Sequence, residues 1–526
     1  MRNLKRALSL GLTATMISGL MVMGSSAASY ADVTSEQNQE AIEVLKSVGI
    51  MTGDEKGNFN PEAKLTRNEM AVVMSNLMAY NIKNYANTSH FTDVPEWAEP
   101  YVAACYTNGI TAGVTATTYG GSENLTTAQA ALMVMKALGY FQYQSDFEND
   151  WQLSTVKQAN KIDLFDDVDA GVKEDITRNQ LAQLVLNALE SGTVEADDDT
   201  IKVNADGVTV EAGKVKYNYI TSAKDYAEAI DNKTVTNNDG TMSTGCIVEL
   251  GEKLYNGDLT KKRTTDDFGR PANQWEYQAK EVGTYADTAD TVFTATVTSK
   301  KLYDAVGKTA AEDYKWTVSV DGEKVDDFSN STLVKNKAND DADVLKGVWK
   351  GMGTGNGVIT EVFVDGTDKT VDVAVIHQYA AEVLKVDEEE GTITLSDLSG
   401  VNGVADAKDE FETKDFAEDD IVIYTYANGD IQSVYAAEKI EGEVTSVRVK
   451  TITNNDGDLV TPGEGDNFTV NGTTYKYNKT MKVGEMLDTD NVNNDVVAYM
   501  DANGYVAYVD ESAVTYDYAY VLSMGS

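Results

Sequence analysis

Two arginines stand where their charge could bind an anion. Arg67 and Arg178 each follow a threonine, Thr66 or Thr177, that has Glu or Gln three residues further on. A threonine with Glu or Gln at this spacing is a capping box, which marks the start of a helix. A helix start offers backbone N–H groups to an anion, and a guanidinium can bind a carboxylate through two parallel hydrogen bonds. The alternative is that each arginine only braces its own loop.

Residues that commonly perform catalysis are scarce. The chain has two histidines, His90 and His377, and two cysteines, Cys105 and Cys246, which leaves little for a Cys/His metal site or a disulfide framework. The patterns G-x-S-x-G, H-E-x-x-H and the Walker loop do not occur. No Asp/Glu pair stands out by its spacing, although any two could converge in so acidic a chain. We predict that Cys105 and His377 are packed residues, that the chain has no catalytic residue and that it is not an enzyme.

Two short acidic segments resemble the middle of an EF-hand calcium loop. They are Asn454–Gly457 and Asn237–Gly240, and both lack the acid at the first position and the glutamate at the end. We interpret them as turns. We therefore expect no metal site of defined ligands and no cofactor, and we leave open a structural Ca²⁺ that carboxylates bind diffusely.

Charge and composition exclude several classes of protein. The 526 residues include 85 acidic and 43 basic side chains, for a formal charge of −42. A surface this acidic repels the phosphates of nucleic acid and the head groups of anionic lipids, so neither is an expected partner. The hydrophobic fraction of 42% is enough for a sizeable core and excludes wholesale disorder.

The N-terminus has the layout of a secretory signal peptide, which we place at residues 1–31. A basic start and an uncharged apolar segment from Ala7 to Met23 precede a small-x-small cleavage site at Ser29–Ala31. The alternative is a membrane anchor, which the polar residues after the site disfavour. No later segment approaches eighteen apolar residues, so we expect no membrane association after cleavage. An exported chain of this kind stays on a cell only by binding something there.

Three copies of one helical unit follow, over about residues 32–192. After Thr66, Thr126 and Thr177, apolar residues recur at the same offsets of four, seven, eight, eleven and twelve residues. This spacing forms one stripe of an amphipathic helix. A shorter helix with an apolar pair at i, i+3 precedes each copy. Three matched starts and stripes indicate an internal repeat.

These residues resemble the S-layer homology repeat. Its pattern is F-x-D-V-x-x-x-W-A, a helix, G-I-x-x-G, a loop that ends F-x-P, and T-R-x-E at the start of a second helix. The matching residues, by repeat, are Gly49, Ile50, Gly53, Phe59, Pro61, Thr66, Arg67 and Glu69; Phe91, Asp93, Val94, Trp97, Ala98, Gly109, Ile110 and Gly113; and Thr177, Arg178 and Gln180. The resemblance implies a pseudo-trimeric bundle. It also implies binding to secondary polysaccharides of the Gram-positive cell wall, often with ketal-linked pyruvate, in grooves between repeats.

The resemblance and the helix-start chemistry together nominate six glycan-binding residues. They are Arg67, Arg178, Trp97, Asp93, Thr66 and Thr177. Trp97 could stack on a sugar face or belong to the core. Asp93 is expected first as the N-cap of the following helix, with a groove role second.

Each repeat departs from the family pattern somewhere. The second repeat has Thr127 in place of the arginine, and the third has Phe147 in place of the aspartate, although Trp151 keeps the tryptophan register. The first begins so close to the expected cleavage site that its Phe-Asp-Trp head is missing. We therefore predict at most two working grooves.

The rest of the chain is predicted to form strands. Runs with a period of two, rich in β-branched and aromatic residues, occur at 208–210, 214–220 and 291–297. Hairpin signals at Asn428-Gly429 and Asn503-Gly504 belong to two similar segments, which predicts two copies of a small barrel-like or sandwich-like β-module.

The expected fold class is therefore multidomain, with a helical bundle of three repeats followed by mainly-β modules. The expected boundaries are 1–31 for the signal peptide; 32–85, 86–140 and 141–192 for the repeats; 193–200 for an acidic linker; 201–379 for a β-rich region; and 380–437 and 438–526 for the two β-modules.

The predicted function is that of an exported structural protein on a Gram-positive cell wall. The repeats would hold it non-covalently on an anionic wall polysaccharide, and the β-modules would self-associate to form or decorate a surface layer. The alternatives are a wall-anchored glycoside hydrolase, since such repeats are also joined to enzymes, and a glycan-binding adhesin.

Overall fold

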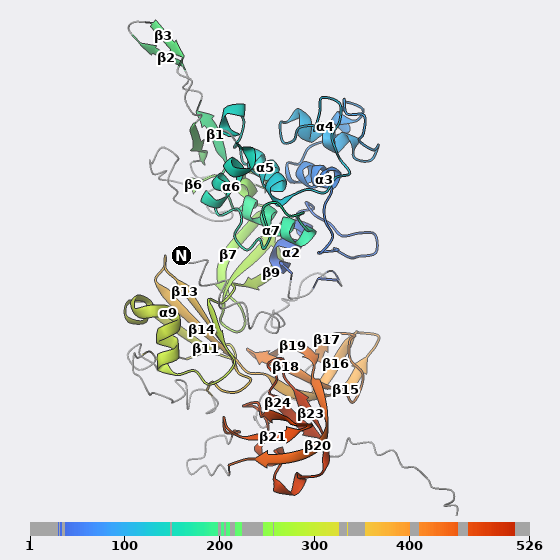
Figure 1. The fold of residues 1–526 in the computed structure, drawn as a ribbon, viewed down its shortest axis with the longest axis vertical. Helices are drawn as coiled ribbons and strands as arrows, with labels where there is room; N and C mark the ends of the chain where they lie inside the picture. The colour runs from blue at the N-terminus through green and yellow to red at the C-terminus, as the bar shows by residue number, and fades with distance from the viewer. Residues whose placement is uncertain are drawn as a thin grey trace, which may run out of the picture. The chain divides into compact units, whose positions relative to one another are not determined.

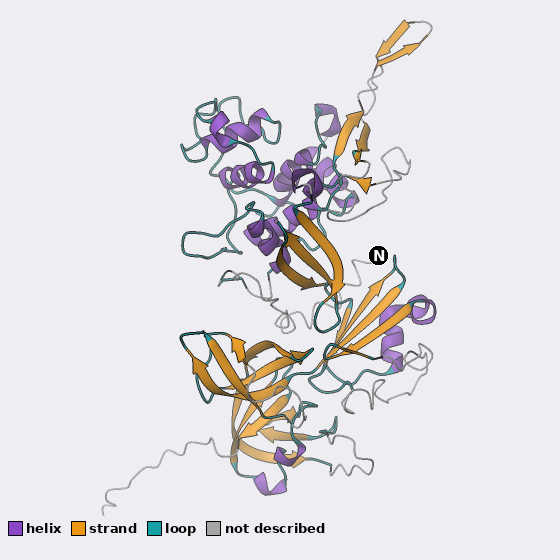
Figure 2. Ribbon diagram, turned by 180° about the vertical axis from the view of Figure 1, so that it is seen from behind, coloured by secondary structure: helices purple, strands orange, loops and turns teal. Residues whose placement is uncertain are grey.

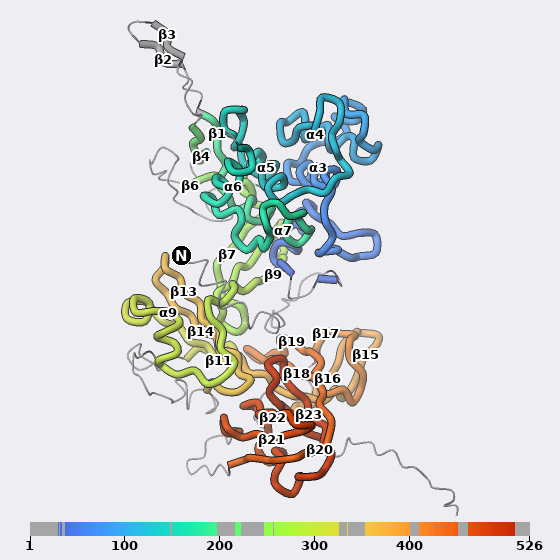
Figure 3. The backbone as a smooth tube through the Cα atoms, in the orientation of Figure 1, coloured from blue at the N-terminus to red at the C-terminus, as the bar shows by residue number. Residues whose placement is uncertain are grey.

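The computed structural model divides the chain into two compact units. It describes residues 30, 32–33, 37–147, 150–197, 201–204, 207–210, 216–222, 246–255, 257–325, 334, 353–399, 410–450 and 461–510. The N-terminal unit contains the described residues up to Arg263 together with Asn273–Thr284. The C-terminal unit contains Thr264–Ala272 and the described residues from Tyr285 onward. Figure 1 labels the elements of both, and Figure 3 follows the same backbone as a tube.

Six helices of the N-terminal unit form three pairs, which confirms the predicted helical repeat. They are α2 (Gln39–Ser47), α3 (Arg67–Leu77), α4 (Glu99–Thr107), α5 (Thr127–Ala137), α6 (Trp151–Lys161) and α7 (Arg178–Leu189). The second helix of each pair starts with the predicted capping box, at Thr66, Thr126 and Thr177. Short 3₁₀ turns at Ile82–Tyr85 and Gln144–Phe147 lie in the connections between pairs.

The repeats close on one another as a ring. The first helix of each repeat packs on the second helix of another, so that α4 contacts α3, α6 contacts α5, and α2 contacts α7. At the centre, Leu125 donates its backbone N–H to Leu65 (2.9 Å), Ile176 to Leu125 (3.0 Å), and Leu65 to Ile176 (3.3 Å). All three residues are buried. The bundle therefore has approximate threefold symmetry and a closed cycle of hydrogen bonds on its axis.

The expected acidic linker at 193–200 is wrong over its first five residues. Val194–Asp197 form strand β1, which pairs antiparallel with β4 (Lys216–Tyr219). Thr193 and Val194 are buried, and Val194 donates its N–H to the carbonyl of Leu138. The acidic composition misled the prediction because in a half-buried strand every second side chain faces solvent and can be polar.

The N-terminal unit continues with short strands and one helix. The predicted strands at 208–210 and 214–220 are confirmed by β3 and β4. The remaining elements are β2 (Ile201–Asn204), β3 (Gly207–Val210), β5 (Thr221–Ser222), β6 (Cys246–Ile247), α8 (Leu250–Tyr255), β7 (Leu259–Thr265), β8 (Pro271–Tyr277) and β9 (Lys280–Ala286).

The sheet β7–β8–β9 packs on the helical repeats through a buried carboxylate. The indole N–H of Trp275 on β8 donates to Oε1 of Glu40 on α2 at 2.6 Å, and the amide of Asn273 donates to the same oxygen at 3.3 Å. Lys261 on β7 forms an ion pair of 2.8 Å with Glu190, directly after α7. The repeat bundle is therefore completed by residues that lie far beyond position 192.

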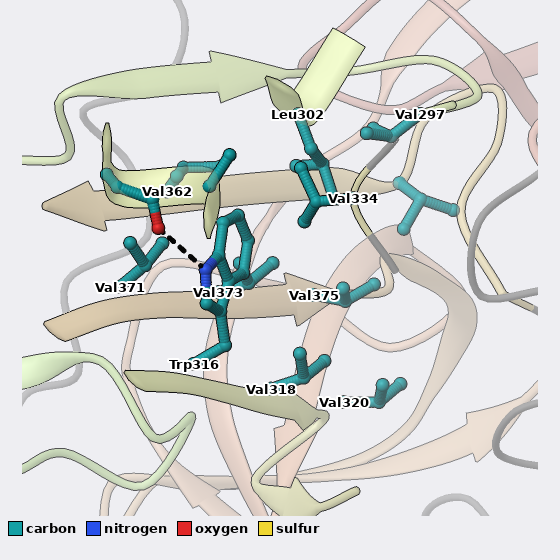
Figure 4. Close-up of a cluster of buried hydrophobic side chains, with 13 residues drawn as sticks. Val297, Leu302, Trp316, Val318, Val320, Val334, Val362, Val371, Val373 and Val375 are labelled. Atoms are coloured by element: carbon teal, nitrogen blue, oxygen red, sulfur yellow. Dashed lines mark hydrogen bonds between the residues drawn. The ribbon is translucent and has the colours of Figure 1, made fainter. Parts of the chain in front are cut away.

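The C-terminal unit begins with a sheet covered by a helix. Strands β10 (Thr291–Phe293), β11 (Lys315–Val320), β12 (Glu323–Lys324), β13 (Ile359–Asp365) and β14 (Thr370–Ile376) form it in the order β10-β13-β14-β11-β12. Helix α9 (Ser299–Asp313) supplies Leu302 to the core, which is otherwise mainly valine from the strands, as Figure 4 shows. The indole of Trp316 lies in this core and donates to the carbonyl of Ala310 at 3.1 Å.

Two five-stranded sheets follow, and they confirm the predicted pair of β-modules. The first contains β15 (Tyr379–Asp387), β16 (Thr392–Asp397), β17 (Glu410–Glu412), β18 (Ile421–Ala427) and β19 (Asp430–Ala436). The second contains β20 (Glu438–Arg448), β21 (Asn467–Val470), β22 (Thr473–Lys476), β23 (Asp495–Met500) and β24 (Val506–Asp510). Both place their strands, numbered by sequence, in the order third, second, first, fourth, fifth. The strands of both units are orange in Figure 2.

Local irregularities also match between the modules. Each first strand carries a bulge at the equivalent place, between Val383 and Lys385 in one copy and between Val444 and Ser446 in the other. In the second module, a bridge from Tyr477 to Val506 joins the two edges of the sheet, which makes it a nearly closed barrel. The fold class predicted from the sequence is thus confirmed.

Glu40 gives the N-terminal unit a testable pH dependence. Burial raises the pKa of this carboxyl from 4.5 to about 7, and Glu190 adds to the rise, whereas Trp275, Lys261 and Asn273 oppose it. Because the pKa of Glu40 is higher in the folded chain, its contribution to stability is fully present below pH 4.5 and is lost as the pH rises through about 7. Glu40→Gln removes this titration and keeps an oxygen for Trp275. We expect the wild type to lose on the order of 3 kcal/mol more stability than the variant between these limits.

Urea unfolding followed by tryptophan fluorescence, at a series of pH values, measures this difference. Glu55→Gln, at an exposed glutamate in the loop after α2, is the control and should keep the wild-type pH dependence. Equal pH dependence of the wild type and Glu40→Gln would contradict the prediction.

Candidate functional site

Each predicted arginine binds the loop of a different repeat. Arg178, the first residue of α7 in the third repeat, donates from Nε to the carbonyl of Phe59 (2.7 Å) and from Nη2 to that of Thr52 (2.9 Å). Its guanidinium lies 4.6 Å from the centre of the Phe59 ring. These atoms belong to the loop at 52–60 in the first repeat. We call this arrangement the first site.

Arg67 makes the same contacts one interface further on. It begins α3 in the first repeat and donates to the carbonyls of Ala112 (2.9 Å) and Tyr119 (3.3 Å) in the second. Its guanidinium lies 4.8 Å from the centre of the Tyr119 ring. This arrangement, with the loop at 112–120, is the second site. Each arginine therefore braces a loop, as the alternative to ligand binding states, but the loop belongs to a neighbouring repeat, because closure of the bundle brings that loop against the helix start.

An aspartate holds each of these loops from the other side. Asp93 accepts hydrogen bonds from the backbone N–H groups of Tyr119 (2.7 Å) and Gly120 (2.8 Å). Burial raises the pKa of Asp93, but these two donors outweigh it and the net pKa is lowered. The prediction that Asp93 caps the next helix is wrong, because α4 begins only at Glu99 and the carboxylate is used by the loop.

The first repeat has two of the three head residues that the sequence prediction gave as missing: Tyr30 stands for the phenylalanine and Asp32 for the aspartate, whereas Glu36 occupies the tryptophan position. Asp32 accepts from the N–H groups of Phe59 (2.7 Å) and Asn60 (2.6 Å), as Asp93 does in the second repeat. The hydroxyl of Tyr30 accepts from the N–H of Gly53 at 2.7 Å, and the Tyr30 ring lies 5.5 Å from that of Phe59. The signal was present as Y-A-D-V at positions 30–33. It was missed because Tyr replaces Phe and the segment overlaps the predicted cleavage site.

The third interface lacks both halves of this arrangement. Thr127 stands at the arginine position of α5 and donates its hydroxyl to the carbonyl of Glu174 at 3.2 Å. Phe147, at the aspartate position of the third repeat, stacks on Phe141. The loop is also shorter, because 14 residues separate Asp163 from Thr177 whereas 17 separate Gly49 from Thr66. Thr127 and Phe147 belong to different repeats, but the packing of the repeats into a ring brings both replacements to the same interface.

The helix starts do not offer the free N–H groups that the sequence argument assumed. The first two N–H groups of α3, at Arg67 and Asn68, donate to the carbonyls of Glu123 and Gly121. The third, at Glu69, donates to the hydroxyl of Thr66. Helix α7 repeats this pattern with Thr177 as its cap. Thr66 and Thr177 therefore act as structural caps here.

The arginines supply the positive charge of both sites. Each uses Nε and Nη2 for the loop carbonyls, which leaves Nη1 without a hydrogen bond to any described residue. Burial lowers the pKa of Arg178, and nearby carboxylates led by Glu69 oppose that change. A guanidinium stays protonated at neutral pH, so each site presents a guanidinium cation.

Trp97 is exposed, so the alternative that it is a core residue is wrong. Its side chain is 56% accessible and precedes α4.

The two remaining candidates for chemistry are buried. Burial raises the pKa of the Cys105 thiol to about 11, so it carries little nucleophilic thiolate at neutral pH. His377 follows β14, with Nδ1 2.9 Å from Asp321 and Nε2 2.9 Å from the carbonyl of Gly353. Both are packed residues, as predicted. No group of three or more His, Cys, Asp or Glu among the described residues is placed to hold a metal ion.

Comparison with known proteins identifies the repeats. Residues 29–71 and 90–131 match the model of the S-layer homology domain. The chain carries S-layer homology repeats. The matched segments are the first and second repeats, which contribute the loops of the two sites. Within the part of the chain that the structure describes, no helix is long and apolar enough to cross a membrane.

Curated relatives are surface proteins of Gram-positive bacteria. The chain is 28% identical to the surface-layer 125 kDa protein of Lysinibacillus sphaericus over 62% of its length, and 22% identical to the middle cell wall protein of Brevibacillus brevis over 90%. It is 25% identical over 36% of its length to an endoglucanase of a Bacillus species. The aligned regions span 25%, 50% and 22% of those relatives. The repeats and these similarities assign the protein to the cell wall of a Gram-positive bacterium.

The contacts of Tyr30 predict where the signal peptide ends. Cleavage after Ala31 would remove Tyr30, and with it the hydroxyl that accepts from Gly53. Ser26-Ala27-Ala28 offers another small-x-small site, and the family match begins at residue 29. We expect the secreted chain to retain Tyr30, which intact-mass measurement and N-terminal sequencing of the surface protein determine. A mature chain that starts at Asp32 would show that the first site forms without this tyrosine.

Proposed function

We propose that this protein is a structural component of a bacterial surface layer. Its S-layer homology repeats would hold it non-covalently on a secondary polysaccharide of the cell wall, and its β-modules would form or decorate the layer. The observation that carries the proposal is the pair of matching sites. Each combines an arginine, a loop from another repeat, and an aspartate that fixes the loop.

The chemistry of the sites suits an acidic sugar substituent. A guanidinium with one nitrogen still available can bind a carboxylate such as that of a ketal-linked pyruvate. The surrounding charge is unfavourable, since Asp32, Asp54 and Glu69 all lie close enough to Arg178 to affect its pKa. An anionic polymer would therefore be recognised by local contact with the guanidinium and not by long-range attraction.

The β-modules supply a second reason for the structural proposal. They repeat one topology, and the relatives that match most of the chain are named for surface layers and cell walls. Exposed carboxylates of such acidic modules could be bridged by Ca²⁺ between neighbouring molecules.

The endoglucanase relative favours one alternative, a wall-anchored glycoside hydrolase. Such an enzyme needs two carboxyl groups about 5 to 10 Å apart beside a sugar-binding surface. The similarity covers 36% of this chain and 22% of that enzyme, so most of the enzyme has no counterpart in the aligned region. We therefore prefer the structural role.

Removal of both arginines tests the anchoring role. Arg67→Ala with Arg178→Ala should abolish co-sedimentation of the mature protein with purified cell-wall sacculi, because each site loses the guanidinium that binds its loop and offers a free nitrogen to a carboxylate. Lys157→Ala with Lys161→Ala removes two exposed cations from α6 and is the matched control, which should bind as the wild type does. Undiminished co-sedimentation of the arginine variant would exclude these residues from the site.

Electron microscopy tests the structural role. Purified mature protein at high concentration with Ca²⁺ should form ordered sheets in negative stain, and cells that lack the protein should lose part of their surface lattice. A chelator should disperse sheets that depend on bridged carboxylates. Only dispersed monomers at high protein and Ca²⁺ concentration would contradict the lattice proposal.

A further inference from the structure

Both sites contain a row of contacts that leads away from the arginine. In the second site the guanidinium of Arg67 lies over Tyr119, whose ring centre is 5.4 Å from that of Phe91. Phe91 is 5.2 Å from Tyr106, and Tyr106 is 4.6 Å from His90. We call this series the second-site row. Its inner rings, Tyr119 and Phe91, are buried, whereas its outer rings are exposed.

The first site has the same row with a different end. Arg178 lies over Phe59, and Phe59 packs on Tyr30. The next position is occupied by Lys46, whose Nζ is 4.3 Å from the centre of the Tyr30 ring. Lys46 on α2 and Tyr106 on α4 are equivalent, because each directly follows the apolar pair of its helix, at Leu45 and Cys105.

The loops of the two sites differ in charge, as the outer ends of the two rows do. The first-site loop contains Asp54, Glu55 and Lys56, whereas residues 112–120 of the second-site loop include no charged side chain. Val114 in this neutral loop is 61% exposed, and Tyr106 is 42% exposed. The segment 84–135 contains no lysine or arginine. The surface around the second site is therefore aromatic, and its charged groups other than the arginine are acidic: Asp93, Glu99, which accepts from the N–H of Ser89, and Glu123, which lies beside Gly120.

We propose that Tyr106 and His90 form a stacking platform for an uncharged sugar ring in the wall polymer, in which the ring of Tyr106 packs on the sugar face and His90, inclined to it by 60°, lines the edge. The first site, which ends in Lys46, lacks this platform. The two sites would then bind different parts of one polymer. Tyr106 is therefore a residue that determines which sugar the second site binds. The proposal rests on the proposed anchoring function and deepens it.

The physical argument is the match between an exposed aromatic pair and a pyranose. One face of a sugar ring presents C–H groups, which pack on aromatic rings, while its hydroxyls remain available to polar groups at the edge. Tyrosine suits this role because it combines a large apolar face with a polar tip. Tyr106 and His90 are two adjacent exposed aromatic side chains beside the exposed Val114, and such a contiguous apolar surface can bind a ligand where a single exposed side chain would not indicate one.

Calorimetric titration of the full mature chain tests the proposal, with soluble polysaccharide released from sacculi of the producing strain as the probe. Tyr106→Ala should weaken binding about three- to tenfold, the range expected for loss of one aromatic contact. The loss should be similar at about 0.05 M and about 0.5 M NaCl, because stacking is screened far less than charge pairing. Tyr106→Phe should retain affinity, since it keeps the ring.

Two controls make the result specific. Leu153→Ala removes a 67% exposed apolar side chain from α6 of the third repeat, and it should leave affinity unchanged. His90→Ala removes the outermost ring, which is exposed and lies outside any helix. The affinity of this variant for the polysaccharide tests the platform if Tyr106→Ala fails to fold. We expect it to weaken binding at both salt concentrations.

The outcomes separate this proposal from the anchoring proposal. Loss of binding in the arginine double variant, with wild-type affinity for Tyr106→Ala and His90→Ala at both salt concentrations, would overturn the platform and leave the anchoring role standing. No binding of polysaccharide by the wild type would overturn both. A loss in Tyr106→Ala that disappears at high salt would also overturn the platform, because it would indicate a charge effect.

Discussion

The structure of the anchor depends on closure of three repeats around one cycle of backbone hydrogen bonds. Leu65, Leu125 and Ile176 each donate to one of the others and accept from the third, in a buried position. This cycle exists only when all three repeats are present. It sets each helix start against the loop of a neighbouring repeat. The carbonyls of that loop accept hydrogen bonds from the first backbone N–H groups of α3, α5 and α7. A single repeat would leave those groups unsatisfied and its apolar stripe exposed.

The same closure explains why the arginine and aspartate contacts are unevenly distributed among the three interfaces. An arginine from one repeat and an aspartate from another must be present together for a site to form. Arg178 with Asp32 and Arg67 with Asp93 meet this condition, whereas Thr127 faces the repeat whose aspartate is replaced by Phe147. The replacements of the arginine and of the aspartate thus remove the same site, at the third interface. The third repeat still serves the bundle, because it provides Ile176 for the central cycle and Arg178 for the first site.

Acidity has different consequences in different parts of the chain. The overall charge of −42 would oppose an anionic ligand at long range, so the recognition proposed above would require contact with a local cation. In buried places the same carboxylates join elements together. Glu40 binds Trp275 and Asn273 between the repeats and the following sheet, and Asp266 forms a buried ion pair with Arg270 in the C-terminal unit. A side chain that looks like surface charge in the sequence can therefore be part of an interface.

The sequence by itself determined the helical repeat, its capping boxes, the two β-modules and the arginine positions, because these follow from periodicity and short-range turn chemistry. It did not determine what each arginine contacts, because that depends on which repeat lies next to which. Asp93 was assigned to its own helix for the same reason, although it binds a loop 26 residues away in sequence. The supposed linker at 193–197 and the contact between Glu40 and Trp275 were likewise decided by tertiary packing. Local patterns specify elements, whereas the partners of a side chain are fixed only when distant segments close into one core.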